Sequence, residues 1–192
     1  MTAPTDLPRT LYFGYGSNLW LDQMKRRCPQ SKLVGIGLLK DWKWIINRRG
    51  YANIIPSVGD IVYGLMFELS EHDEEFLDRS EGVPISYVTE TLPIEFTSVT
   101  TPNDLNSVVG SAAVLRDALV YVDYKRVENG DPKEEYIFRI NKGIIDAERI
   151  GIPKDYFEKY FRPSIPIMPE ALKEPDSMVL DPFAPQLYRV EA

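Results

Sequence analysis

The N-terminal part of the chain has the pattern of a strand, a tight turn and a helix. An apolar run at residues 11–13 predicts a buried strand, and residues 14–18, which include two glycines, predict a sharp turn. Large side chains then recur every four residues, as on one face of a helix: Trp20, Met24 and Cys28. Because Ser and Asn are preferred at helix N-termini, Ser17 or Asn18 is expected to cap this helix.

Further along the chain, alternating or continuous apolar residues predict strands. These strands are expected at residues 32–46, 52–56, 61–69, 87–96 and 111–124. The polar, glycine-containing residues 57–60 predict a turn between the second and the third of them.

Three more helices are expected from capping residues and from apolar positions spaced by three or four residues. One begins at the cap Ser70, ends near Gly82 and carries an acidic face at residues 71–75, which is expected to be exposed. The others cover residues 134–151 and 153–161. The longer one has an apolar stripe formed by Tyr136, Ile140, Ile144 and Ala147. Mostly antiparallel strands, with helices between and after them, indicate an α+β fold with a mixed sheet or a small barrel.

A length of 192 residues favours a single domain over residues 1–192. Its core is expected at about residues 10–161. Residues 97–110 read as a polar loop, and the proline-rich residues 162–192 read as an extended arm. The apolar anchors expected in this arm are Ile165, Ile167, Met168, Leu180, Phe183 and Leu187. This arm is expected to lie along the domain or along a second copy of it, which leaves a homodimer open.

Composition restricts the partners and the compartment. A formal net charge of -7 argues against a nucleic-acid partner, and the basic pairs at residues 26–27 and 48–49 read as solvated surface. No apolar run approaches membrane-spanning length, and residues 1–9 lack the order of a signal peptide. The single cysteine excludes an internal disulfide and fits a reducing compartment, so a cytoplasmic protein is expected.

The reactive side chains present in the chain restrict the catalytic mechanisms that are possible. The only histidine, His72, lies in the acidic run of residues 71–75, so a histidine-activated serine or cysteine nucleophile is not expected. One Cys and one His cannot form the usual zinc site, and neither a metal nor another cofactor is expected. Any chemistry must therefore be carried by carboxylates, tyrosines, hydroxyls or the backbone.

The turn at residues 14–18 is a candidate binding site for a small anion. Unpaired N–H groups and the positive end of the helix dipole meet where a strand passes through a tight turn into a helix. The glycine spacing fits neither G-x-x-x-x-G-K-[ST] nor G-x-G-x-x-G, so a small carboxylate is favoured over a nucleotide. An ordinary capped strand-to-helix turn remains the alternative.

Glu81 is the candidate general base. It lies at the expected C-terminus of its helix, the negative end of the dipole, with Asp78 nearby and apolar residues 83–85 behind it. Each of these features disfavours the ionised carboxylate and is expected to raise the pKa of Glu81, as a base working near neutral pH requires. The alternative is an exposed glutamate that precedes a helix-terminating glycine.

Five segments resemble the γ-glutamylcyclotransferase family in the same order along residues 12–156. They are YGSNL (15–19), IIPSVGDIVYGL (54–65), DRSEGV (78–83), YIFRINKG (136–143) and GIPKDY (151–156). Two features depart from the family pattern. The spacer between Glu81 and Tyr87 is one residue shorter than expected, and neither residues 97–110 nor the arm after residue 161 has a clear counterpart.

The resemblance implies a small mixed, mostly antiparallel β-barrel with surrounding helices. It also implies that Glu81 is the catalytic acid/base. The residues implied to bind substrate are Tyr12, Phe13, Gly14, Tyr15, Gly16, Ser17, Asn18, Leu19, Tyr87 and Tyr136.

The implied reaction is attack of an α-amine on a γ-glutamyl carbonyl, which releases 5-oxoproline and an amine or amino acid without a cofactor. A γ-glutamyl amino acid, glutathione or a glutathione adduct would then be the substrate. Two alternatives remain open: a γ-glutamylamine cyclotransferase and a non-catalytic ligand-binding domain of the same fold.

Overall fold

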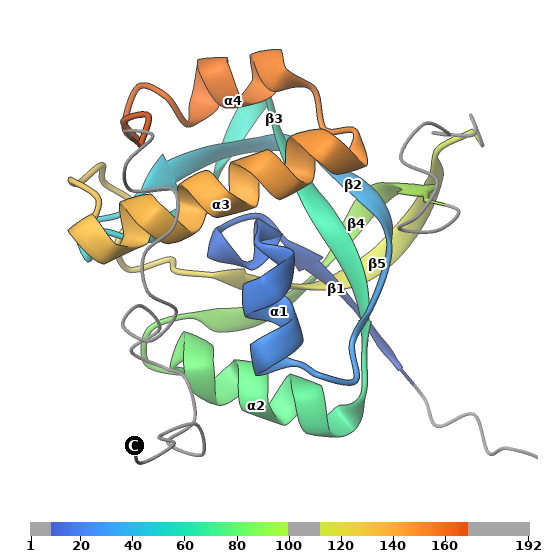
Figure 1. Cartoon of the computed structure of the whole chain (residues 1–192). Coiled ribbons are helices and arrows are strands. Elements are labelled where there is room, and N and C mark those ends of the chain that lie inside the picture. The colour runs from blue at the N-terminus through green and yellow to red at the C-terminus, as the bar shows by residue number, and fades with distance from the viewer. Residues whose placement is uncertain (1–8, 100–111, 169–192) are drawn as a thin grey trace, which may run out of the picture.

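The computed structural model describes residues 9–99 and 112–168, and these residues form a closed barrel with helices packed on it (Figure 1). In the described part of the chain the strands are β1 (Thr10–Gly14), β2 (Lys32–Ile46), β3 (Ala52–Leu69), β4 (Val88–Ser98) and β5 (Val114–Val122). The helices are α1 (Leu21–Arg27), α2 (Glu71–Glu81), α3 (Glu134–Ile150) and α4 (Lys154–Tyr160), with a short 3₁₀ turn, η1, at Ser17–Leu19.

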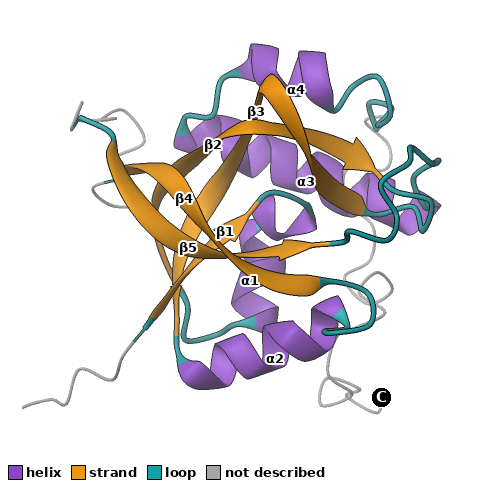
Figure 2. Ribbon diagram, turned by 180° about the vertical axis from the view of Figure 1, so that it is seen from behind, coloured by secondary structure: helices purple, strands orange, loops and turns teal. Residues whose placement is uncertain are grey.

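The barrel closes in the order β1-β3-β2-β4-β5, with β5 returning to β1. All neighbouring strands pair antiparallel except β1 and β5, which pair in parallel where Tyr12 faces Leu119. Helices α1 and α3 lie in front of the strands in Figure 1 and behind them in Figure 2, which is seen from the opposite side. The expected α+β barrel, mostly antiparallel and surrounded by helices, is therefore confirmed.

The apolar face of α3 is fully buried, as its stripe predicted. Tyr136, Ile140, Ile144 and Ala147 are all inaccessible or nearly so. After α4, Phe161 stacks on Trp44 of β2 with the ring centroids 3.9 Å apart, and the Trp44 indole N–H donates to the carbonyl oxygen of Tyr15 at 3.1 Å. The packing of α4 on the barrel thus helps to fix the turn that follows β1.

The separate strands predicted at residues 52–56 and 61–69 are one continuous strand, β3, so the turn predicted at residues 57–60 is wrong. Both halves pair with β2, and residues 57–60 form an irregularity opposite Asp41, where the register shifts. Gly59 has φ +85°, and its N–H donates to Asp41 Oδ1 at 2.9 Å. The turn residues bend the strand without reversing it, because β2 is long enough to pair with both halves.

The prediction that Ser17 or Asn18 caps the first helix is also wrong. Helix α1 begins at Leu21 after the N-cap Trp20, which offers no side-chain cap, and the N–H of Leu21 donates to Asp146 of α3 at 3.0 Å. Asp146 thus takes the place of a capping side chain for the first N–H of α1, and the side chains of Ser17 and Asn18 make other hydrogen bonds.

The ends of α2 are as predicted, and Glu71, His72 and Glu75 of its acidic face are exposed, but Asp73 is not. Ser70 Oγ accepts from the N–H of Asp73 at 3.2 Å, and Gly82 ends the helix with φ +68°. Asp73 is completely buried instead of exposed with its acidic neighbours. Asp73 is buried because α2 packs against α1 here, where Cys28 Sγ donates to the carbonyl oxygen of Asp73.

The first residues of the predicted arm pack against α3. Ile165 is fully buried and Met168 nearly so, while Arg162 donates to Asn141 Oδ1 at 2.8 Å. Asn141 in turn donates to the carbonyl oxygen of Pro166 at 3.1 Å. The anchor predicted at Ile167 is wrong, because its side chain is exposed between the buried Ile165 and Met168. The anchors predicted at Leu180, Phe183 and Leu187 and most of the loop predicted at residues 97–110 lie outside the described residues. No helix of the described part is long and apolar enough to cross a membrane.

Truncation after Phe161 should lower the free energy of unfolding by about 2 kcal/mol, because it exposes the site that Ile165 fills and removes the contacts to Asn141. Urea denaturation of the full and truncated chains measures the loss. Truncation after Met168 is the control that retains these contacts. If cutting at residue 161 leaves the stability unchanged, the segment contributes nothing to the fold.

Candidate active site

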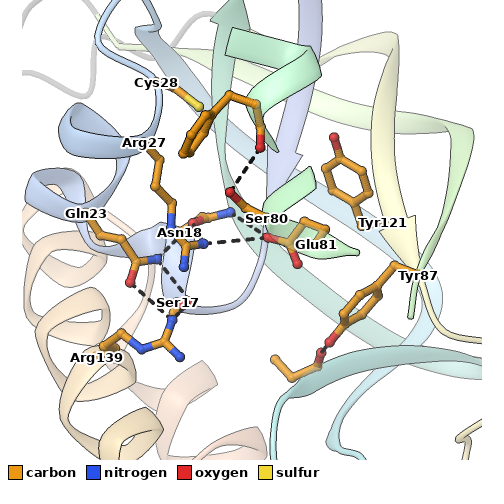
Figure 3. A network of polar contacts seen from close by, with 12 residues as sticks. Ser17, Asn18, Gln23, Arg27, Cys28, Ser80, Glu81, Tyr87, Tyr121 and Arg139 are labelled. Atoms are coloured by element: carbon orange, nitrogen blue, oxygen red, sulfur yellow. Dashed lines mark hydrogen bonds and ion pairs between the residues drawn. The ribbon is translucent and has the colours of Figure 1, made fainter. Parts of the chain in front are cut away.

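A cavity partly open to solvent lies where η1, α2 and α3 meet one end of the barrel (Figure 3). Its lining is rich in tyrosines, arginines and small polar residues and contains a single carboxylate among the described residues. The lining residues are Tyr12, Tyr15, Gly16, Ser17, Asn18, Arg27, Arg49, Tyr51, Ala52, Ser80, Glu81, Tyr87, Tyr121, Tyr136 and Arg139.

The single carboxylate is that of Glu81, at the last residue of α2. Its Oε1 accepts a hydrogen bond from Asn18 Nδ2 at 3.2 Å and lies 3.8 Å from Arg27 Nη1. The side chain is only 20 % exposed. Glu81 therefore faces the cavity with a donor and a cation beside it, so the alternative of an exposed helix-end glutamate is wrong.

The surroundings predicted for Glu81 are correct only in part. Asp78 lies near Glu81 in the sequence, as expected, but its carboxylate is engaged by another residue: it accepts a hydrogen bond from the Tyr121 hydroxyl at 2.7 Å. Pro84 and Ile85 point into solvent and do not enclose the carboxylate, because the chain turns outward directly after Gly82. Arg27 of α1 and Asn18 of η1 are polar partners of Glu81 that no local pattern around Glu81 could indicate.

The orientation of the Asn18 amide is determined by its neighbours. Asn18 Oδ1 accepts from Gln23 Nε2 at 2.9 Å and from Arg27 Nη1 at 3.2 Å. Because both of these partners are donors, the amide NH₂ must face the other way. It donates to the Tyr12 hydroxyl at 2.9 Å and to Glu81.

Gln23 and Arg139 extend this network to α3. Gln23 Nε2 and Arg139 Nη1 both donate to Ser17 Oγ, at 3.0 and 3.3 Å, and Arg139 Nη1 lies 3.4 Å from Gln23 Oε1. Arg139 is itself paired with Glu135, whose Oε2 lies 2.8 Å from Nη2 and 2.9 Å from Nε. The polar side chains at the start of α1 are thus held by a buried arginine from a helix more than a hundred residues away in sequence.

Two of the predicted surface arginines belong to this cavity. Arg27 is almost completely buried, and Arg49 is half-buried and lines the pocket, so the prediction of solvated surface is wrong for both. Their neighbours Arg26 and Arg48 form outward ion pairs, with Asp22 and Glu128. The i, i+4 spacing of Gln23 and Arg27 on one face of α1 is the signal that could have indicated a buried polar face.

The tyrosines form the walls of the cavity through their own hydrogen bonds. Tyr15 donates to the carbonyl oxygen of Tyr121 at 2.5 Å, Tyr87 donates to that of Ala52 at 2.7 Å, and the Tyr136 hydroxyl accepts from the N–H of Ser17 at 3.1 Å. Burial raises the pKa of Tyr136 to about 12 and raises the pKa values of Tyr15 and Tyr87 well above the usual 10. At neutral pH these side chains are uncharged phenols, so Glu81 is the group of the lining that can accept a proton.

Most of the residues implied to bind substrate line the cavity, but Phe13, Gly14 and Leu19 do not. Successive residues of a strand point to opposite faces, so Phe13 points away from the cavity that Tyr12 lines and packs inside the barrel. A Cβ placed on Gly64 or Gly37 would lie 2.6 or 2.8 Å from the Phe13 ring. Leu19 is buried against Gly143 of α3.

The buried tyrosines make a prediction for alkaline pH. Their phenols titrate near pH 10 in the unfolded chain and, because of burial, at higher pH in the folded protein, near 12 for Tyr136. The unfolded chain therefore loses these protons first, and the free energy of unfolding should fall as the pH rises from 10 towards 12. Ultraviolet difference spectra should show part of the 11 tyrosines ionising only together with unfolding. Full ionisation in a still folded protein would contradict this.

The fold and the cavity agree with the sequence comparisons. The profile of the family described as "Gamma-glutamyl cyclotransferase, AIG2-like" matches residues 12–137, which include both η1 and α2. This chain belongs to that family.

Curated relatives carry the same family name. The chain is 31% identical over 97 residues to the bovine "Gamma-glutamylcyclotransferase" and over 93 residues to the human one, matching 45% and 43% of this chain. These matches span about half the length of the two relatives, 50% and 49%. The mouse protein of the same name is 27% identical over 159 residues, which cover 78% of this chain and 76% of that relative.

Solved structures support the fold. One named "Gamma-glutamyl cyclotransferase" superposes with a TM-score of 0.66 at 22% identity, covering 89% of this chain and 95% of that one. A human protein described as uncharacterized gives a TM-score of 0.64 at 24% identity, with 89% and 91% covered. At these identities the likeness concerns the barrel and its helices.

Proposed function

We propose that this protein is a γ-glutamylcyclotransferase that uses Glu81 as its acid/base. The observation that carries the proposal is the position of Glu81. It is the one carboxylate of the described cavity lining, and it is held against Asn18 at the turn that follows β1. The family to which the chain belongs and the names of its relatives support the same activity.

In the proposed reaction the substrate supplies both its nucleophile and its electrophile. Its α-amine attacks its own γ-carbonyl carbon, a ring C–N bond forms, and the amide C–N bond breaks to give 5-oxoproline and an amine. Two protons leave the α-ammonium nitrogen as it becomes the ring N–H, and both end on the departing nitrogen, which leaves as an ammonium. Glu81 relays these protons, first as a base and then as an acid.

The rest of the site would bind and bend the substrate. The turn at residues 16–18 lines the cavity together with Glu81. Its backbone N–H groups would bind the α-carboxylate or the developing oxyanion, and the N–H of Ser17, which now donates to the Tyr136 hydroxyl, would have to exchange that partner for the substrate. Tyr15, Tyr87 and Tyr136 would press the glutamyl chain into the ring-closing conformer, which brings amine and carbonyl into contact. No covalent intermediate or cofactor is required by this scheme.

The test is to incubate the purified protein with a panel of γ-glutamyl compounds and to measure 5-oxoproline. The panel contains γ-glutamyl amino acids, glutathione, a glutathione adduct and γ-glutamyl alkylamines. Release from amino acid or peptide conjugates supports the proposal, and release from alkylamines alone identifies a γ-glutamylamine cyclotransferase. Binding without any 5-oxoproline would identify a ligand-binding domain and overturn the proposed enzyme.

We further propose that the protein acts on small molecules in the cytoplasm. Its one cysteine, Cys28, is a free and fully buried thiol, and burial raises its pKa to about 12. A protein without a disulfide among its described residues suits a reducing compartment.

A further inference from the structure

Arg49 brings a guanidinium to the edge of the cavity from the turn between β2 and β3. Its charged group lies 5.6 Å from the centre of the Tyr51 ring and 5.8 Å from that of Tyr87, both of which line the cavity. Such positions over aromatic faces hold an arginine in place through its π contacts. Arg49 is thus positioned by the pocket walls.

The guanidinium of Arg49 has no hydrogen-bond or ion-pair partner among the described residues, although its Nη1 is buried. The two other arginines of the cavity differ in this respect. Arg139 is paired with Glu135, and Arg27 contacts Asn18 and Glu81. A buried donor without a partner costs free energy, and an anion entering the cavity would supply the missing acceptor.

The backbone around Arg49 is held by a hydrogen bond and by close packing, which position the side chain for a ligand. The N–H of Arg49 donates to Asn47 Oδ1 at 3.0 Å, and Asn47 itself is completely buried. The next residue, Gly50, has φ +86°. It is packed so closely that a Cβ added to it would lie 2.8 Å from the Lys133 side chain. A preorganised receptor binds more tightly because less freedom is lost on binding.

Arg49 and Glu81 both line the cavity, and both act electrostatically on Tyr87. Both charges act on the Tyr87 hydroxyl, whose pKa is raised by burial and by Glu81 and lowered by Arg49. Glu81 bonds to Asn18 in the turn at residues 16–18, and the proposed function assigns this part of the site to the substrate's α-amine and α-carboxylate. Arg49 belongs to another turn, between β2 and β3, and none of its contacts given above is to Glu81 or to residues 16–18, so it offers a second place for an anion.

We propose that Arg49 binds a carboxylate on the leaving group. The site would then select γ-glutamyl amino acids or peptides over γ-glutamyl amines, because only the former carry a second carboxylate. This inference rests on the proposed function and adds the residue that determines its leaving-group preference. A planar guanidinium suits this role, since it can form two parallel hydrogen bonds with one carboxylate.

The experiment compares γ-glutamylalanine with γ-glutamylalaninamide, which differ only in the leaving-group carboxylate. With the wild-type protein, kcat/KM for 5-oxoproline release should be about 10–100-fold higher for the acid. In Arg49→Met, which keeps an apolar stem against Tyr51, this ratio should fall to near one through a higher KM for the acid. Arg49→Lys should retain part of the preference, since it keeps the charge but loses the planar fork.

The control is Arg48→Met, which changes the neighbouring exposed arginine that pairs with Glu128 and should leave the ratio unchanged. Thermal melting of each variant checks that it is folded. Equal losses on both substrates in Arg49→Met would overturn the inference, because Arg49 would then bind the shared γ-glutamyl part. A wild-type protein that turns over both substrates without preference would overturn it as well.

Binding measurements separate this inference from the proposed function. If the wild-type protein releases no 5-oxoproline, the proposed function fails, but calorimetry can still compare the two ligands. Binding of γ-glutamylalanine that weakens about 10–100-fold in Arg49→Met, with no such change for the amide, would still support the carboxylate site. An equal affinity of wild type and Arg49→Met for γ-glutamylalanine would refute it.

Discussion

Replacement of Glu81 by Gln should reduce kcat for 5-oxoproline release by about 10²–10⁴-fold, equivalent to roughly 3–5 kcal/mol of barrier. The amide has nearly the size of the carboxylate but cannot relay a proton. Its oxygen can still accept from Asn18 Nδ2, which now bonds to Glu81 at 3.2 Å, so the fold and the cavity should persist. Steady-state kinetics and a denaturation curve of the same preparation measure both expectations.

Glu75→Gln is the matched control for this variant, because it makes the same substitution on an exposed position of α2. It should turn over like the wild type. If Glu81→Gln retains wild-type kcat, Glu81 is not the acid/base. If Glu81→Gln has no activity and also shows no cooperative unfolding transition, the variant has simply not folded. The comparison is then made with Glu81→Asp, which keeps the carboxylate.

Replacement of Asn18 by Leu should lower the free energy of unfolding by about 3–5 kcal/mol and abolish most activity. Four hydrogen bonds meet at the Asn18 amide, and their partners Tyr12, Gln23 and Arg27 are buried and cannot turn to water. Leucine leaves each of them without one partner. Urea denaturation measures the loss, and Gln30→Leu, an exposed amide, should change the stability by no more than about 0.5 kcal/mol. A stable Asn18→Leu protein would contradict the importance of this network.

Asn18→Asp distinguishes an electrostatic role of Asn18 from a purely structural one. The substitution conserves shape but places a carboxylate oxygen where Nδ2 now donates to Glu81. Two carboxylates at this distance cannot both ionise easily, so the pair should hold a proton at higher pH than Glu81 alone. The acid limb of the pH–rate profile should therefore move to higher pH. An unmoved profile with lower activity would indicate that Asn18 acts only by supporting the turn.

Several parts of this protein could be predicted from short stretches of sequence. The Ser70 cap, the Gly82 terminus and the apolar stripe of α3 are local features, because capping and helical periodicity depend on residues a few positions apart. The position of Glu81 at a helix end follows from the same signals. Even the location of the turn after β1 could be derived, since glycines and polar residues interrupt an apolar run there.

Other features depended on contacts between distant segments. Residues 57–60 look like a turn in isolation, and only the length of β2 opposite them keeps the strand continuous. Arg27 looks like a surface residue beside Arg26, but α1 packs with this face on the cavity. There Asn18 accepts a hydrogen bond from Arg27, and the Glu81 carboxylate compensates its charge. Burial of a charged side chain is decided by partners that lie elsewhere in the chain, so no local pattern predicts it.

The sequence by itself therefore determined which segments form helices and which form strands. It also determined the family and the candidate acid/base, Glu81. The tertiary structure decided which side chains share the cavity with Glu81. It removed Phe13 and Leu19 from the lining, and it added Arg49 and Arg139. The physical reason is that hydrophobic periodicity and capping are short-range, whereas the electrostatic environment of a buried group is the sum over whatever the fold brings within a few ångströms of it.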